Sequence, residues 1–284
     1  MDKFPAICNS INVIIANNTI TPDFFTAAIL SLLVAVISLK LKFLTLSGVF
    51  AASVMALFIF GFGQWKWTIP MFTFFFLSSL LSKFRGKRNP LMDTFFDKSG
   101  QRDYKQVLAN GGFAALLVII NFFYPSELFY YAYVSSIASV CADTWATELG
   151  TINPVKTYNI LNLKEVEQGR SGAVSINGLF AALCGALVIA LSAMFWIQTN
   201  SLIIIFLILL AGFAASIIDS VLGASLQVQY TCLKCRKLTE RKIHCGISTE
   251  KTKGKFWMTN DTVNLITSLT GGIIGLVLID LISY

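Results

Sequence analysis

The chain has 284 residues, of which 55% are hydrophobic and only 13% are charged. Soluble domains carry about 25% charged residues, so this composition, with a mean hydropathy of +0.70, excludes a soluble globular protein and predicts an integral membrane protein. A single His residue excludes a catalytic site built on several histidines. In a membrane protein, the formal charge of +7 indicates basic loops on one side of the bilayer and no nucleic-acid partner.

Eight segments of the chain are long and apolar enough to be membrane-crossing helices, which need about 20 mostly apolar residues. They lie at about 24–39, 43–62, 67–82, 106–124, 128–148, 174–196, 202–228 and 262–282. We therefore expect an all-α polytopic membrane helix bundle of about eight transmembrane helices. The bundle would form a single domain over residues 1–284.

The distribution of Lys and Arg predicts the orientation of this bundle. Twenty of the 22 cations lie at residues 40–42 and in the loops 83–105, 149–172 and 230–258, whereas only Lys3 and Lys66 fall on the other side. Cytoplasmic loops of membrane proteins are enriched in Lys and Arg. The large basic loops are therefore expected in the cytoplasm, with both termini on the opposite side.

Two segments that open predicted helices are nearly identical. Residues 110–116 read NGGFAAL and residues 177–183 read NGLFAAL, and the helix that follows each carries Asp143-Thr144 or Asp219-Ser220. We interpret this as a parallel internal repeat of helices 4–5 and 6–7. The alternative is that small residues recur because membrane helices pack on Gly and Ala.

Four acidic residues gather towards the cytoplasmic face in this topology, and intramembrane carboxylates are costly enough to mark a functional site. Carboxylates hold Mg²⁺, and helix N-termini bind phosphate. We therefore expect a site for Mg²⁺ and a phosphorylated ligand. In the alternative, the acids pair with loop cations or cap helices. The predicted magnesium ligands are Asp143, Glu148, Asp219 and Asp261.

Polar and basic residues of the same face complete the predicted site. Arg170 lies in a short Gly-bounded turn directly before the sixth helix, where a turn can cradle phosphate. The basic residues have a second interpretation, since orientation signals and lipid contacts also require them. The residues predicted to hold phosphate, nucleotide or metal-bound water are Asn110, Asn177, Asn260, Asn264, Ser220, Gln227, Lys83, Arg85, Arg102 and Arg170.

The last basic loop contains a Cys and His cluster. Cys232 and Cys235 form a CxxC pair, and His244 and Cys245 follow after eight residues. Four such ligands suit tetrahedral Zn²⁺, and a reducing cytoplasm disfavours a disulfide. The sequence leaves two interpretations open, a structural zinc site in the loop 232–245 and free or redox-active thiols.

Several of these motifs together resemble one known family. Residues 142–150, ADTWATELG, resemble the signature of the transmembrane protein 19 and phytyl-phosphate kinase family. The motif from Asp219 to Gln227, the Cys and His loop and the Asn260-Asp261-x-x-Asn264 motif resemble it as well. One departure is the segment 169–173, GRSGA, where the family often has a Gly-Thr-Asn/Asp-Gly-Gly sequence.

The resemblance implies a kinase that converts an isoprenyl monophosphate of phytyl, geranylgeranyl or farnesyl type to the diphosphate, with a nucleoside triphosphate such as CTP and Mg²⁺. The acceptor phosphate is already anionic, so charge neutralisation and positioning matter more than a general base. Asp143, Glu148, Asp219 and Arg170 would be the catalytic residues. A transporter for an ion or small anionic metabolite is the alternative function, because intramembrane acids also serve ion coupling.

Overall fold

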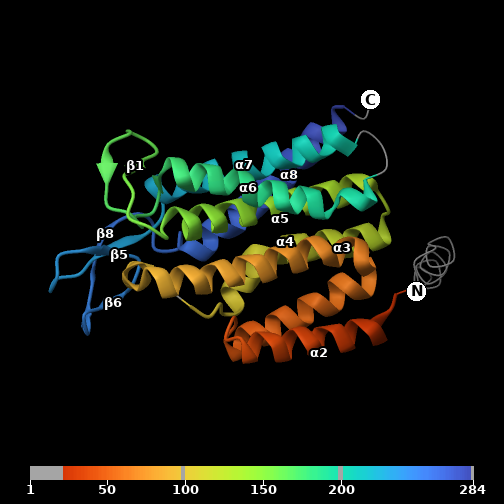
Figure 1. The fold of residues 1–284 in the computed structure, drawn as a ribbon, viewed down its shortest axis with the longest axis horizontal. Coiled ribbons are helices and arrows are strands. Elements are labelled where there is room, and N and C mark those ends of the chain that lie inside the picture. The colour runs from red at the N-terminus through yellow and green to blue at the C-terminus, as the bar shows by residue number, and fades with distance from the viewer. Residues whose placement is uncertain (1–21, 97–99, 198–200, 283–284) are drawn as a thin grey trace, which may run out of the picture.

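A computed structural model describes residues 22–96, 100–197 and 201–282 as an elongated helix bundle (Figure 1). The helices are α2 (Phe24–Lys40), α3 (Leu46–Arg88), α4 (Tyr104–Phe123), α5 (Glu127–Gly150), α6 (Ile176–Ser192), α7 (Ser201–Ser225) and α8 (Asn260–Asp280). Two short 3₁₀ turns are η1 (Pro90–Thr94) and η2 (Met194–Trp196). The predicted helical segments therefore agree with the described elements to within a few residues at most boundaries.

Helix α3 is interrupted at Gln64, which has non-helical dihedral angles (φ 54°, ψ −152°). In Figure 1 the two halves of α3 run side by side in opposite directions. The break lies between the predicted segments 43–62 and 67–82, so these two segments correspond to the two halves of α3, which reverse direction at Gln64.

Helix α5 lies at the centre of the bundle and packs against α3, α4, α6, α7 and α8. Its contact with α8 depends on small residues, as is common where membrane helices approach closely. Ser136 and Ser268 share a hydrogen bond of 2.8 Å between their hydroxyl oxygens, and the Ser139 hydroxyl donates to the Thr267 carbonyl. A side chain at Gly275 would overlap Ser135. The α5–α8 interface is therefore both polar and tight.

Helix starts are fixed by side chains that cap free backbone N–H groups. Asp103 and Gln106 form a capping box at the start of α4, and Ser175 accepts from the Gly178 N–H at the start of α6. Thr259 does the same for the Thr262 N–H at the start of α8. These three helix starts lie at the same end of the bundle, where α5 and α7 finish, because residues from all five helix ends line one cavity there.

Short strands occur in the loops at that end, which the sequence had not predicted. The first sheet has the order β2 (Glu165–Val166), β1 (Thr157–Asn159), β3 (Ala173–Val174). The second has the order β5 (Leu238–Thr239), β4 (Gln229–Thr231), β8 (Glu250–Lys253), and β6 (Ile243–His244) pairs with β7 (Ile247–Ser248). All pairings are antiparallel. In Figure 1 the labelled strands β1, β5, β6 and β8 project from the left end.

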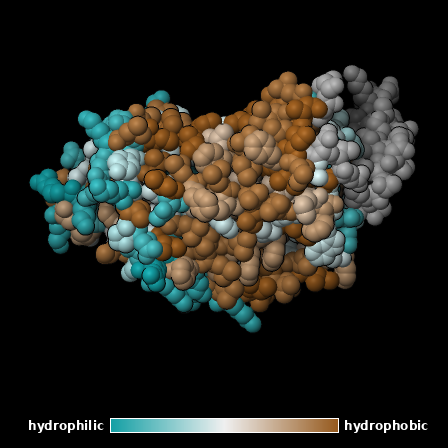
Figure 2. Space-filling view, turned by 45° about the horizontal axis from the view of Figure 1, so that its top comes forward, coloured by the Kyte–Doolittle hydropathy of each residue, from teal (hydrophilic) through white to brown (hydrophobic). Residues whose placement is uncertain are grey.

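A broad apolar band covers the middle of the molecule, and hydrophilic residues gather at the end that carries the strands (Figure 2). Four helices, α3, α4, α7 and α8, are long and apolar enough to cross a membrane, and α2 and α6 are shorter apolar helices of 17 residues each. The prediction of a polytopic helical membrane protein is confirmed at this level. The count of eight spans stays a prediction.

The internal repeat also stays a prediction, because the structure places its two motifs differently. Asn110 is buried in the second turn of α4, whereas Asn177 is exposed in the first turn of α6. Burial depends on neighbouring helices, and two similar segments with different neighbours therefore acquire different environments.

Candidate functional site: a polar cavity at the end of the bundle

A polar cavity of about 210 Å³ lies among the ends of α4, α5, α6, α7 and α8. The loop around Arg170 and the segment that follows β5 close it from outside the bundle. Most of the predicted site residues line this cavity. They are Arg85, Arg102, Asn110, Asp143, Glu148, Arg170, Asp219, Ser220, Gln227, Asn260, Asp261 and Asn264.

Two predicted residues lie elsewhere in the described part of the chain. Asn177 is exposed on α6, outside the cavity lining. Lys83 donates to the Leu41 carbonyl oxygen at 3.3 Å and approaches the ring of Phe43, which places its charge on the side of α2. Neither residue belongs to the lining that the other twelve predicted residues share.

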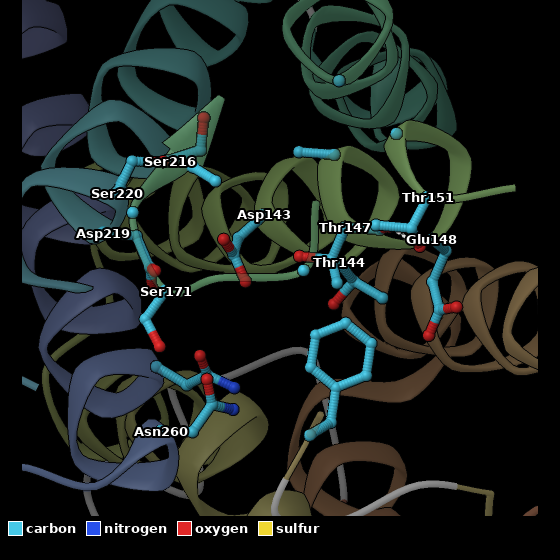
Figure 3. A pocket seen from close by; sticks show the side chains of 18 of the residues that line it. Asp143, Thr144, Thr147, Glu148, Thr151, Ser171, Ser216, Asp219, Ser220 and Asn260 are labelled. Atoms are coloured by element: carbon cyan, nitrogen blue, oxygen red, sulfur yellow. Dashed lines mark hydrogen bonds between the residues drawn. The ribbon is translucent and has the colours of Figure 1, made fainter. Parts of the chain in front are cut away.

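An acid pair occupies one side of the cavity. The carboxyl groups of Asp143 and Asp219 lie beside each other, and the Thr267 hydroxyl donates to Asp219 Oδ2 at 2.6 Å. Figure 3 shows both carboxyl groups directed to the open space that Ser171 and Asn260 also face. No ion pair within the described residues includes either acid. The negative charges of two adjacent carboxylates repel each other, and a cation between them removes this repulsion, so the pair suits a divalent metal ion.

Glu148 has a basic partner, which Asp143 and Asp219 lack. The Nε of Arg85 donates to Glu148 Oε2 at 2.8 Å, and the Ser82 hydroxyl donates to Glu148 Oε1 at 2.6 Å. The same Arg85 pairs with Asp93 at 2.5 Å, and its side chain is only 4% exposed. For Glu148 the geometry therefore agrees with the second interpretation of the acids, in which a loop cation neutralises the carboxylate.

Basic groups face the cavity from two other directions. Arg102 is fixed through its backbone, because its N–H donates to the Phe43 carbonyl and its carbonyl accepts from the Thr45 N–H. Arg170 comes from the Gly-bounded turn, and its buried Nε has no hydrogen-bond partner among the described residues. A buried donor without a partner is costly, and an anionic ligand that accepts from Arg170 Nε would remove this cost. The guanidinium is therefore suited to bind an anion.

Lys253 lies beside Arg170 and was not predicted. Burial lowers the pKa of its ammonium group, and the positive charge of Arg170 lowers that pKa further. The Lys253 Nζ also donates to the Ala224 carbonyl at the end of α7, at 2.9 Å. Two cations held side by side favour an anion between or beside them, as a polyphosphate would supply.

Glu240 lines the cavity and was also missed by sequence reasoning. Its Oε1 accepts from the Ser171 hydroxyl and from Gln227 Nε2, both at 2.7 Å, and its charge acts on Asp143. The sequence did hold a signal, because Glu240 is the only acidic residue between Gln229 and Thr249, in a loop rich in cations.

An apolar cleft of about 100 Å³ adjoins the polar cavity. It lies between α2, α3 and α4 and is lined mainly by aliphatic and aromatic side chains, among them Met55, Ile59 and Phe74. The cleft and the cavity share Arg102, Gln106 and Asn110 in their linings. The buried Asn110 Oδ1 at this junction has no hydrogen-bond partner among the described residues.

Fold and site together define a polytopic helical membrane protein whose polar cavity at one end adjoins an apolar cleft. The family described as integral membrane protein DUF92 matches residues 29–272, and the chain belongs to this family. This confirms the predicted resemblance to the transmembrane protein 19 and phytyl-phosphate kinase family.

Three relatives have similar sequences over most of this chain. Protein PGR of Arabidopsis thaliana is 30% identical over 86% of this chain and 91% of its own length. A membrane protein of Methanocaldococcus jannaschii is 30% identical over 89% of this chain and 93% of its own. The chloroplastic Protein VTE6 of Arabidopsis thaliana is 22% identical over 83% of this chain and 66% of its own. No solved structure matches the chain significantly.

Proposed function

We propose that this protein is a membrane kinase that phosphorylates an isoprenyl monophosphate to the diphosphate, with a nucleoside triphosphate as the donor. The observation that carries the proposal is the junction of the polar cavity with the apolar cleft at Arg102, Gln106 and Asn110. A substrate with a phosphate head and a hydrocarbon tail matches two adjoining spaces of opposite polarity.

The acceptor would lie with its phosphate beside Arg102 and its tail in the cleft of α2, α3 and α4. Arg102 is suited to this role because its backbone is bonded on both sides to the loop before α3. Its guanidinium lies over the Phe74 ring, which lines the cleft. The cation would therefore stand at the entrance of the apolar space and hold the head group there.

Asp143 and Asp219 would hold Mg²⁺, and the amides of Asn260 and Asn264 lie in the same cavity. When bound, the ion would neutralise the phosphate oxygens of the nucleotide as charge develops on them. Arg170 and the adjacent Lys253 would neutralise the rest of the triphosphate. CTP is our preferred nucleotide on the strength of the family resemblance.

The reaction needs little from the protein beyond positioning and charge. An oxygen of the acceptor phosphate attacks the terminal phosphorus of the donor, and the bond from that phosphorus to the bridging oxygen breaks. The products are the isoprenyl diphosphate and a nucleoside diphosphate. Because the attacking oxygen is already anionic at neutral pH, no residue has to remove a proton. This agrees with a cavity lined by Arg, Asp and Asn and without the single His residue, His244.

The test is product formation by the purified full chain in detergent. Farnesyl, geranylgeranyl and phytyl phosphate are each incubated with Mg²⁺ and with CTP or ATP labelled at the terminal phosphate. We expect a labelled isoprenyl diphosphate that Asp143→Asn and Asp219→Asn abolish and that Glu127→Gln retains. Glu127 is the control because it pairs with Lys66, outside the cavity lining.

The alternative function, transport of an ion or small anionic metabolite, is an outcome of the same experiment. No labelled product with any acceptor and donor, together with substrate flux across liposomes that contain the protein, would overturn the kinase proposal. The sidedness is also a proposal. We place the cavity at the cytoplasmic face, because most of the basic loops lie at that end, and cysteine labelling from either side of sealed vesicles tests it.

A further inference from the structure

The segment between α7 and α8 carries a cluster of three cysteines and one histidine that the kinase chemistry does not use. One ligand atom from each of Cys232, Cys235, His244 and Cys245 lies within 4.8 Å of all the others. The Cys235 Sγ is 3.5 Å and the Cys245 Sγ 3.2 Å from His244 Nδ1. Zinc–sulfur bonds of about 2.3 Å and tetrahedral angles separate neighbouring ligands by roughly 3.5–3.8 Å. The four atoms are thus close to the spacing that one tetrahedral ion requires.

The backbone brings the two halves of the cluster together by two hairpin turns. Between β4 and β5, the Cys232 N–H donates to the Lys237 carbonyl, and the Arg236 N–H donates to the Cys232 carbonyl. The Cys232 Sγ also lies 3.7 Å from the His244 carbonyl oxygen, which links the two halves directly.

The second turn joins β6 to β7 through Cys245 and Gly246, which both have positive φ angles of 53° and 78°. Positive φ at both central residues is the conformation of a two-residue hairpin turn. Side chains of adjacent residues usually point in different directions, but the turn brings those of His244 and Cys245 together, with Cys245 Sγ 3.2 Å from His244 Nδ1. Both can therefore bind one ion. The left-handed backbone conformation of Cys245 is unfavourable for a residue with a Cβ atom, and the energy of a metal–sulfur bond would offset this cost.

The segment 229–253, called the module below, buries few apolar side chains. Leu233, Ile243 and Ile247 are exposed by 48%, 67% and 39%, whereas Tyr230 and Cys232 are buried. Modules of this size usually need a metal, a disulfide or a partner to fold. A metal ion bound by the Cys and His cluster would stabilise the module in place of an apolar core.

The module matters for the cavity because it binds the segment that follows α3. The Thr239 hydroxyl and the Glu240 N–H donate to the Phe95 carbonyl, and Arg241 donates to the Asp93 and Phe96 carbonyls. These bonds hold Glu240 where it accepts from Ser171 and Gln227. Residues 239–241 follow directly after the turn that carries Cys232 and Cys235. The position of Glu240 therefore depends on that turn being well ordered.

We propose that Cys232, Cys235, His244 and Cys245 bind one structural Zn²⁺ ion, and that this ion holds residues 239–241 against the polar cavity. Three thiolates and one imidazole select zinc among the common divalent ions. Four protein ligands leave no position for a reactive water, so the ion is a structural element and Glu240 is the positioning residue that depends on it.

The experiment is metal analysis of the full chain, purified in detergent without a metal-affinity tag or chelator. We expect one zinc per chain, and replacement by Co²⁺ to give the intense absorption of thiolate-bound tetrahedral cobalt. Cys235→Ser and Cys245→Ser should lose the metal, and Cys245→His should retain it. The matched control is Cys184→Ser, which removes a free cysteine of α6 and should leave the zinc content unchanged.

A second measurement follows the consequence for the cavity without using activity. Extraction of zinc from the folded wild-type chain should raise hydrogen exchange at residues 93–96 and 229–253, and zinc addition should reverse this, while α5 stays protected. Absence of zinc in a folded wild-type protein, or a disulfide among the three cysteines, would overturn the proposal. So would metal removal that leaves exchange at 93–96 unchanged. None of these outcomes depends on the kinase reaction, and the two proposals can therefore fail separately.

Discussion

Asp143 on α5 and Asp219 on α7 lie beside each other in the lining of the polar cavity, and no basic side chain of the described residues forms an ion pair with either. Helix packing alone would favour two apolar residues at this position, because adjacent acids are costly away from water. The pair therefore lowers the free energy of unfolding of the free protein. It is suited to bind a positively charged ligand.

This relationship predicts opposite effects of one substitution on stability and on ligand binding. Asp143→Asn removes a charge from the pair and should raise the melting temperature of the free protein by a few degrees. Mg²⁺ at about 100 times its dissociation constant should stabilise the wild type by about 2.7 kcal/mol and the variant hardly at all. Thermal unfolding with and without Mg²⁺ measures both effects. Equal stabilisation of the wild type and the variant would show that the metal binds elsewhere.

Arg85 holds Glu148 and Asp93 together from a nearly buried position. Loss of one partner of a buried ion pair leaves the other charges uncompensated and costs about 3–5 kcal/mol, so Arg85→Met should destabilise the protein by about this amount. The control is Lys66→Met, which breaks the more exposed Lys66–Glu127 pair and should cost less than about 1 kcal/mol. Denaturant unfolding of both variants provides the comparison, and similar losses would contradict the prediction.

The approach of α8 to α5 depends on Gly275, where an added Cβ atom would overlap Ser135. Gly275→Ala should therefore destabilise the bundle, by about 1–3 kcal/mol for an overpacked site, and Ser135→Gly in the same chain should restore part of the loss. Gly112→Ala is the matched control, because an added Cβ atom there meets open space. Helix propensity predicts a gain of up to about 1 kcal/mol for the control. Unfolding in detergent or bicelles measures all three variants.

Lys253 should make stability depend on pH in the alkaline range. Because the pKa of Lys253 is lowered in the folded state, the unfolded chain binds more protons between that pKa and 10.5, and stability therefore rises with pH across this interval. Relative to Lys253→Met, the wild type should gain stability as the pH is raised towards 10.5. Unfolding at several pH values measures the difference, and Lys164→Met, at an exposed position of another loop, controls for loss of charge. A difference between wild type and Lys253→Met that stays constant with pH would contradict it.

The apolar cleft predicts a change in acceptor length. Ala56 lines the cleft on α3, and Ala56→Leu should shorten the available space. We expect a loss of activity with geranylgeranyl or phytyl phosphate that exceeds the loss with farnesyl phosphate by about tenfold, a difference of about 1.4 kcal/mol. Competition between the acceptors in one reaction measures this ratio directly. An equal loss for all acceptors would place the tail outside the cleft.

The sequence by itself determined the class of the protein and singled out twelve residues that line the cavity. Bilayer thickness sets the length of an apolar membrane-crossing segment, and Lys and Arg gather in the loops between such segments, so the helices were predictable from local composition. Acids such as Asp143 and Asp219 stood out because their cost in an apolar segment is also a local property.

Only the tertiary structure decided how these groups pair. It paired Glu148 with Arg85 and placed Lys83 and Asn177 outside the cavity lining. It also brought Glu240 into that lining and Lys253 next to Arg170, both from a loop without hydrophobic periodicity. It also placed the apolar cleft beside Arg102. Pairing depends on which helix ends meet across the bundle, a long-range contact that composition and spacing along the chain do not encode.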